Sequence, residues 1–256
     1  MQSGEKRHRI TLEILESSTT ALLQKIAFPD GMRGLDLGCG TGEVTFQLAR
    51  RTGREGKIIG MDQDADNIRN AQEKQRKAEI RNVQFVWKNI TEWQETERYD
   101  LVYSRFLLNR LKQPLTTLEG IYKSLKSGGM AVVEDMDCSN YYCHPACYAF
   151  DRYLELFTEA KKRQGTDPFI GHKLWSQLRA AGFQKIQVQM VPATFLRLQN
   201  KAFASLTLEY IAGMLLFERM VSDAELEVLL QELRVFEQRN DTLITAPGIY
   251  QAWGYK

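Results

Sequence analysis

The chain has 256 residues, of which 43% are hydrophobic and 26% charged, an ordinary balance that excludes disordered, collagen-like and low-complexity proteins. Lys and Arg number 34 against 32 Asp and Glu, and no block of five like charges occurs, so a small ligand is expected rather than nucleic acid. Apolar runs such as residues 214–217 fall far short of the roughly 18 residues of a membrane span. The polar N-terminus lacks the apolar segment of a signal peptide, so we expect no membrane partner, no export and a cytoplasmic location.

A helix, a strand and a glycine-rich loop come first along the chain. Apolar side chains recur at near-helical spacing over residues 9–26, and the turn at 28–31 ends the predicted helix. A short apolar strand over residues 34–37 leads into the loop 38–42, which reads Gly-Cys-Gly-Thr-Gly. Helical spacing resumes at Val44, so this segment is predicted to be a strand, a glycine loop and a helix.

The same alternation of strands and helices then repeats. Buried strands are predicted at 57–61, 83–87, 99–104 and 130–134, and helices at 64–78 and about 115–125. Strands that alternate with helices of 10 to 15 residues are typical of a parallel sheet with helices on both faces.

Beyond residue 137 the pattern becomes less regular. Helices are predicted at 145–163, 173–181, 200–218 and 222–238, and strands at 185–190 and 248–255. Ser222 and Glu225 form a capping box at the start of the last helix. The expected fold is therefore α/β, a doubly wound, seven-stranded, mostly parallel sheet in a single domain, 1–256, with a helical cover inserted before the last strand. We expect the insertions 138–170 and 200–238 to cover the carboxyl edge, where such sheets bind ligands.

Three of the four cysteines lie close together, in the pattern C-x4-C-H-x2-C of residues 138–147. A Cys/His zinc site is one interpretation, but the segment has no CxxC pair and no second cluster completes four ligands. Free thiols in a reducing compartment are therefore favoured, and no metal is expected.

The glycine loop carries the chemistry. Glycines at 38, 40 and 42 let the backbone turn sharply and approach a ligand. A dinucleotide-binding loop, G-x-G-x-x-G, would need glycine at position 43, which is Glu43. Asp36 precedes the loop and would repel a diphosphate but attract an ammonium or sulfonium group.

A second acid comes after the second strand. Asp62 stands 20 residues after Gly42, where a carboxylate can accept both hydroxyls of a ribose and exclude a 2′-phosphate. With D-x-G-x-G-x-G, this pattern resembles the class I S-adenosylmethionine-dependent methyltransferases over most of the chain. Residues 83–90 (VQFVWKNI) resemble the family's adenine-contacting stretch, and residues 125–129 (LKSGG) resemble its LKPGG turn.

The resemblance implies S-adenosylmethionine as the cofactor and a set of residues that bind it: Asp36, Gly38, Cys39, Gly40, Asp62, Gln63, Asn89, Ile90, Ser104 and Arg105. Three of these assignments have alternatives. Asp62 could also cap the helix 64–78, and Asn89 stands where Asp is common, as either a cap or an adenine ligand. Arg105 could pair with a surface acid or contact the cofactor carboxylate.

The resemblance also implies the mechanism. The sulfonium supplies the electrophilic methyl and the leaving group, so the protein aligns a nucleophile and excludes water. Where the acceptor needs a base, the candidate catalytic residues are Asp135, Tyr142 and His144, from a polar segment that also holds Glu134, Asp137 and Tyr141.

The residues after the fourth strand narrow the chemical class of the acceptor. Residues 104–107 read Ser-Arg-Phe-Leu, unlike the N/D-P-P-Y/F tetrapeptide of enzymes that methylate base amines, and the chain lacks the glutamate pair typical of protein arginine methylation. A small-molecule acceptor is favoured. A protein methyltransferase and a cofactor-binding module without catalysis remain alternatives, in a monomer or homodimer.

Overall fold

The computed structural model describes residues 3–191, 194–195 and 201–256, which form two compact units. The first, here the sheet unit, comprises Thr20–Met136, Ile170–Met190 and Tyr250–Lys256. The second, here the helical unit, comprises the described residues within Met1–Thr19, Asp137–Phe169 and Val191–Ile249. The long first helix, α1 (Ser3–Lys25), contributes residues to both.

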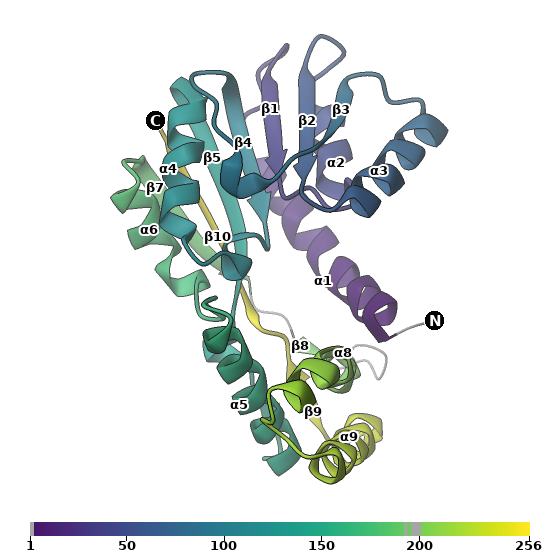
Figure 1. The fold of residues 1–256 in the computed structure, drawn as a ribbon. Coiled ribbons are helices and arrows are strands. Elements are labelled where there is room, and N and C mark those ends of the chain that lie inside the picture. The colour runs from purple at the N-terminus through teal and green to yellow at the C-terminus, as the bar shows by residue number, and fades with distance from the viewer. Residues whose placement is uncertain (1–2, 192–193, 196–200) are drawn as a thin grey trace. The chain divides into compact units, whose positions relative to one another are not determined.

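A seven-stranded, mostly parallel sheet forms the sheet unit, which confirms the expected fold class (Figure 1). The strand order is β3-β2-β1-β4-β5-β10-β7. The order in which strands are added to the sheet therefore reverses between the neighbours β1 and β4. The strands are β1 (Arg33–Leu37), β2 (Lys57–Asp62), β3 (Val83–Trp87), β4 (Tyr99–Arg105), β5 (Leu125–Asp137), β7 (Gln184–Val191) and β10 (Gly248–Tyr255). Parallel pairing joins β1 to β2 and β4, β2 to β3, and β4 to β5.

Alternation along the central strands buries both faces of this sheet. Leu35 and Leu37 of β1 pack on the face covered by α4 (Pro114–Ser124) and α6 (Leu174–Ala180). The opposite face packs against α2 (Glu43–Arg51), α3 (Ala65–Ala78) and the last turns of α1. Burial on both faces explains why these strands read as short continuous apolar runs.

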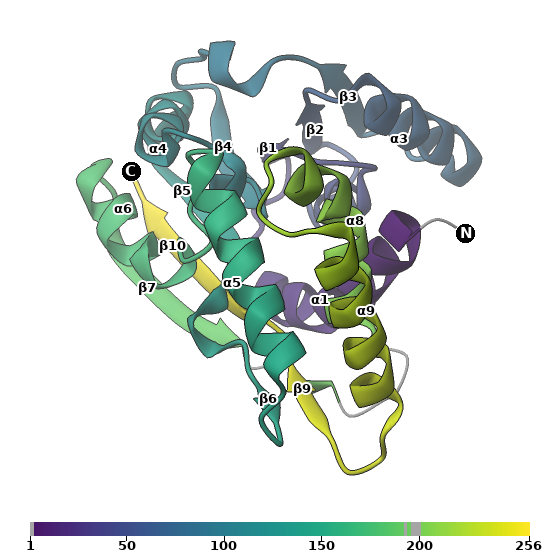
Figure 2. The same cartoon turned by 60° about the horizontal axis from the view of Figure 1, so that its bottom comes forward.

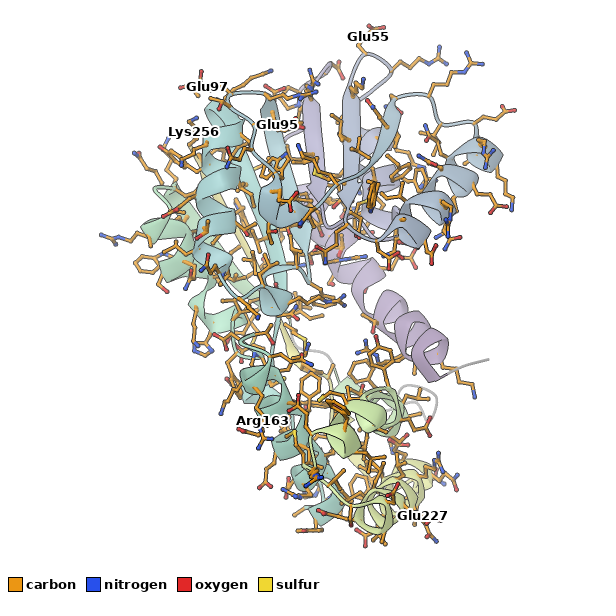
Figure 3. All side chains as sticks on the ribbon, viewed as in Figure 1. Glu55, Glu95, Glu97, Arg163, Glu227 and Lys256 are labelled. Carbon is orange, nitrogen blue, oxygen red and sulfur yellow. The ribbon has the colours of Figure 1, made fainter. Side chains whose placement is uncertain are left out.

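Strand β5 begins earlier than the expected residue 130. Tyr99 pairs with Leu125 and Leu101 with Met130, so the residues expected to form a turn form a bulge within one long strand. Gly128 in the bulge has a φ of 76°, a conformation that glycine adopts without strain. The C-terminal Lys256 stabilises this region, because its Nζ donates to the Leu125 carbonyl at 2.7 Å and lies 3.7 Å from Glu97 (Figure 3).

Three helices and a small sheet make up most of the helical unit. Helices α5 (Tyr148–Arg163), α8 (Phe203–Phe217) and α9 (Asp223–Gln238) pack together (Figure 2). Residue 200, where the penultimate predicted helix starts, lies outside the described residues. Strands β6 (Cys143–His144), β9 (Leu243–Thr245) and β8 (Thr194–Phe195) form an antiparallel sheet that the sequence pattern does not predict, because strands this short carry no detectable alternation.

Side chains accept hydrogen bonds from amides in the first turns of the last two helices. The Ser222 hydroxyl accepts from the Glu225 amide at 3.2 Å, which confirms the predicted cap of α9. Helix α8 has no cap of its own; instead the Glu237 carboxylate of α9 accepts from the amide and hydroxyl of Ser205, at 2.9 and 2.7 Å. The expectation that residues 138–170 and 200–238 cover a ligand stays a prediction.

Candidate functional site

The glycine loop lies between β1 and α2, as predicted. Its three glycines, 38, 40 and 42, have φ angles of 78°, 54° and 87°, in the left-handed region that side chains disfavour. A Cβ at Gly42 would lie 2.7 Å from the Phe85 ring, so no larger residue fits there. The amides of Gly38 and Cys39 both donate to the Met61 carbonyl, which fixes the loop against the end of β2.

Asp36 is buried near the end of β1, just before this loop. Its carboxylate accepts a 2.6 Å hydrogen bond from the Thr45 hydroxyl of α2. Burial raises the pKa of Asp36 to about 7, against the lowering effects of that bond and of the Arg105 charge. A cation bound beside Asp36 would therefore favour its ionised form.

Asp62 contacts the glycine loop directly. Its carboxylate accepts from the amide of Gly40 at 2.8 Å and from the amide of Asp64 at 2.9 Å. The cap of α3 is Asp64, whose side chain accepts from the amides of Asp66 and Asn67, so the alternative role of Asp62 as the cap of this helix is wrong. Asp62 instead joins the end of β2 to the loop, a contact between two motifs that the sequence presents separately.

A lysine that the sequence analysis does not identify also holds the loop. Lys74 of α3 donates to the Thr41 hydroxyl at 2.8 Å and to the Glu43 carboxylate at 2.6 Å. Burial acts to raise the pKa of Glu43, but the bonds from Lys74 and Thr41 outweigh it and hold the pKa below its usual range. Glu43, which breaks the dinucleotide pattern, thus clamps the loop to α3.

The end of β3 presents Asn89 and Trp87. Asn89 is exposed and caps a 3-10 turn, because its side-chain oxygen Oδ1 accepts from the amide and hydroxyl of Thr91 at 3.1 and 2.9 Å. The cap alternative for Asn89 is therefore realised, and its contact with adenine stays a prediction. Ile90, the next residue, is buried. The Trp87 indole, which sequence reasoning misses, is exposed and donates from Nε1 to the Gln63 carbonyl at 2.9 Å.

Strand β4 ends in Ser104 and Arg105, which face opposite sides of the sheet. The Ser104 hydroxyl is buried and has no hydrogen-bond partner among the described residues. Arg105 is half-buried, and its positive charge partly offsets the rise that burial causes in the pKa of Asp36 and of Tyr103. Its guanidinium therefore acts on buried acidic groups of the site rather than on a surface acid alone.

Asp135, a candidate base, is buried and extensively hydrogen-bonded. Its oxygens accept from the amide and side chain of Asn109 and from the amide of Met136. Burial raises the pKa of Asp135 to about 6, against the opposite effect of these bonds. Asp135 therefore orients the segment that comes after β4, next to Ser104 and Arg105.

Glu134 is also fully buried, on the other face of β5. It accepts from the Tyr103 hydroxyl and from the Gln251 amide, so it joins β4, β5 and β10 within the sheet.

Tyr142 and His144, the other candidate catalytic residues, belong to the helical unit and are exposed. The Tyr142 amide donates to the Thr245 hydroxyl at 2.9 Å, and His144 pairs with Leu243 in the small sheet. Their part in catalysis stays a prediction. Tyr141, in contrast, packs edge-on against Phe150 with a centroid distance of 5.0 Å, and burial raises its pKa well above 10.

All four cysteines are free thiols, two of them buried. Burial raises the pKa of Cys138 to about 12 and that of Cys143 to about 11, so both are protonated at neutral pH. Over the described part of the chain, no group of three His, Cys, Asp or Glu residues is arranged to hold a metal. No helix in that part is both long and apolar enough to cross a membrane.

Comparison with known proteins places this geometry in a family. A family model described as a methyltransferase domain matches residues 29–179, more than half of the chain. The demethylmenaquinone methyltransferase of Lactococcus lactis is 30% identical over 142 residues, which are 55% of this chain and 52% of that protein. The trans-aconitate 2-methyltransferase of Rhizobium etli is 29% identical over 116 residues, 45% of this chain and 43% of the relative.

The fold has solved counterparts. Phosphoethanolamine N-methyltransferase 2 of Haemonchus contortus, in complex with phosphomonomethylethanolamine and S-adenosylhomocysteine, superposes with a TM-score of 0.60 at 19% identity. That match covers 94% of this chain and 52% of the other, so the chain spans about half the length of each of these three proteins. Because the matched residues include both the glycine loop and Asp62, the chain belongs to the methyltransferase-domain family, as its resemblance to the class I S-adenosylmethionine-dependent methyltransferases predicts.

Proposed function

We propose that this protein is an S-adenosylmethionine-dependent methyltransferase that acts on a small-molecule acceptor by direct in-line transfer. The carrying observation is the hydrogen bond from the Gly40 amide to Asp62, which brings the glycine loop and the acid at the end of β2 into one site. Buried Asp36 at the start of that loop opposes a diphosphate and favours a cationic ligand. The named relatives, which methylate demethylmenaquinone and trans-aconitate, support a small acceptor.

Each group in the sheet unit then has a role. Asp62 accepts the ribose hydroxyls, and Asp36 and Arg105 hold the amino-acid end of the cofactor through opposite charges. The hydroxyl of Ser104, buried without a described partner, offers a hydrogen bond to a polar atom of the ligand. Gly38, Cys39, Gly40, Gln63, Asn89 and Ile90 complete the binding set that the resemblance implies.

When bound, the cofactor supplies an electrophilic methyl group and a neutral thioether leaving group. The protein's task is to orient the acceptor and exclude water. Asp135 serves this task as a positioning residue, because its bonds to Asn109 fix the segment after β4. Tyr142 and His144 remain the candidate bases for an acceptor that must lose a proton.

We further propose a cytoplasmic protein, monomeric or homodimeric, without nucleic-acid or membrane partners. Four free thiols support a reducing compartment.

Titration calorimetry with S-adenosylmethionine, S-adenosylhomocysteine and NAD tests the cofactor. We expect binding of the first two and none of NAD, and the reverse result would overturn the proposal. Incubation of the protein with methyl-labelled cofactor and a cell extract tests the acceptor. Label in small molecules supports the proposal, whereas label in protein, or cofactor binding without any transfer, favours the alternative functions.

A further inference from the structure

The end of β3 carries an exposed aromatic side chain at the edge where the candidate cofactor residues gather. Trp87 is 66% exposed, against 46% for Trp175 and 5% for Trp93. An indole is large and apolar, and removing it from water is favourable, so such exposure beside a binding site is informative.

The strand pairing places Trp87 next to the predicted ribose acid. Asp62 and Trp87 are register partners at the ends of β2 and β3. Residues 83, 85 and 87 alternate onto one face of the sheet, the first two buried against α3 and the glycine loop and the third extending beyond that cover. Phe85 packs beside Gly42 of the glycine loop, and Trp87, two residues later on the same face, is exposed to solvent.

The indole is also held in a defined position. Its Nε1 donates to the Gln63 carbonyl at 2.9 Å, and Gln63 comes directly after Asp62. Because the N–H group is used in this bond, the surface that remains for a ligand is the apolar face of the ring. Such a face recognises planar, aromatic groups by stacking rather than by hydrogen bonding.

We propose that Trp87 stacks the exposed face of its indole on the adenine ring of the cofactor. Trp87 is then a specificity-determining residue for the nucleoside end of the site. The inference rests on the proposed function. In this arrangement Asp62 binds the ribose and Trp87 stacks on the base, and the two residues lie at the ends of neighbouring strands. Stacking of a base on an aromatic side chain is worth about 1 to 3 kcal/mol by alanine substitution, which is roughly a 5- to 150-fold change in affinity.

The test uses ligands that contain the base and one that does not. In Trp87→Ala, the dissociation constants of S-adenosylhomocysteine and of adenosine should rise by the same factor, about 5- to 150-fold, because both present the same ring to the indole. Methionine, which lacks the base, should bind the variant and the unaltered protein equally. The exposed position of Trp87 leaves the core intact, and an unchanged melting temperature verifies this.

Fluorescence supplies an independent measurement. Adenosine should quench the emission of the unaltered protein and of the control Trp175→Phe, whose indole packs on Arg179 of α6. The quenching should disappear in Trp87→Phe. An S-adenosylhomocysteine affinity within twofold of normal in Trp87→Ala, or quenching that persists in Trp87→Phe, would overturn the inference while the proposed function stands. A failure of the unaltered protein to bind S-adenosylhomocysteine would overturn both.

Discussion

Replacing Asp62 with alanine tests the central contact of the site. The Asp62 side chain is nearly buried, and its two oxygens take the amides of Gly40 and Asp64 at 2.8 and 2.9 Å. The alanine variant loses the proposed acceptor for the ribose and also leaves a loop amide without its partner. Both affinity and stability should therefore fall.

The magnitudes depend on the kinds of bond removed. A hydrogen bond to a charged group is worth about 1.5 to 3 kcal/mol, so the dissociation constant of S-adenosylmethionine should rise roughly 10- to 150-fold. A buried donor left without an acceptor costs about 1 to 3 kcal/mol. Because the Gly40 amide is only partly buried, the free energy of unfolding should fall by no more than this range.

Asp64→Ala is the matched control. Asp64 caps α3 through the amides of Asp66 and Asn67, and neither bond involves the glycine loop. Loss of a helix cap costs about 0.5 to 2 kcal/mol of stability. Calorimetry and urea denaturation of both variants separate the two effects: Asp64→Ala should lose stability alone, and Asp62→Ala should lose both. Equal affinities in Asp62→Ala and the unaltered protein, or equal losses of affinity in the two variants, would refute the reasoning.

The same geometry leads to three further predictions. Lys74→Met should weaken cofactor binding about 2- to 10-fold, because it removes the partly exposed bonds from Lys74 to Thr41 and Glu43. The control Lys77→Met removes a 2.8 Å pair with Glu73 on the same helix and should leave binding unchanged. Equal effects of the two variants in calorimetry would contradict a role of Lys74 in holding the loop. Because burial raises the pKa of Asp36 from 3.8 to about 7, the folded state holds a proton that the unfolded state releases, and the free energy of unfolding should fall by about 2 to 3 kcal/mol from pH 5 to 8. Urea titrations of Asp36→Asn should show a flatter pH dependence, and an equally steep one would exclude Asp36 as its source. Methyl transfer should survive EDTA, because the sulfonium already carries its leaving group; activity lost to EDTA and restored by zinc would show otherwise.

Local pattern was sufficient for the elements that carry the chemistry. The strand, glycine loop and helix at residues 33–51 depend on neighbouring residues: apolar runs, glycines where φ is positive, and helical spacing after them. The position of Asp62 at the end of β2 is determined in the same way. The central strands of the mostly parallel sheet could be predicted because burial on both faces gives β1, β2, β4 and β5 short apolar runs between helices.

The sequence pattern could not predict which residues far apart in the chain contact one another. Lys74 reaches the glycine loop across 33 residues, and Trp87 meets Gln63 across 24, because β2 and β3 are neighbours in the sheet. Asp135 is a candidate catalytic residue in the sequence, but its bond to Asn109, 26 residues earlier, appears only in the folded chain. The small sheet of β6, β8 and β9 and the division into two units depend equally on contacts between distant segments. Periodicity reports which face of an element is buried, whereas the side chains that meet across strands are decided by strand order and register, which exist only once the chain has folded.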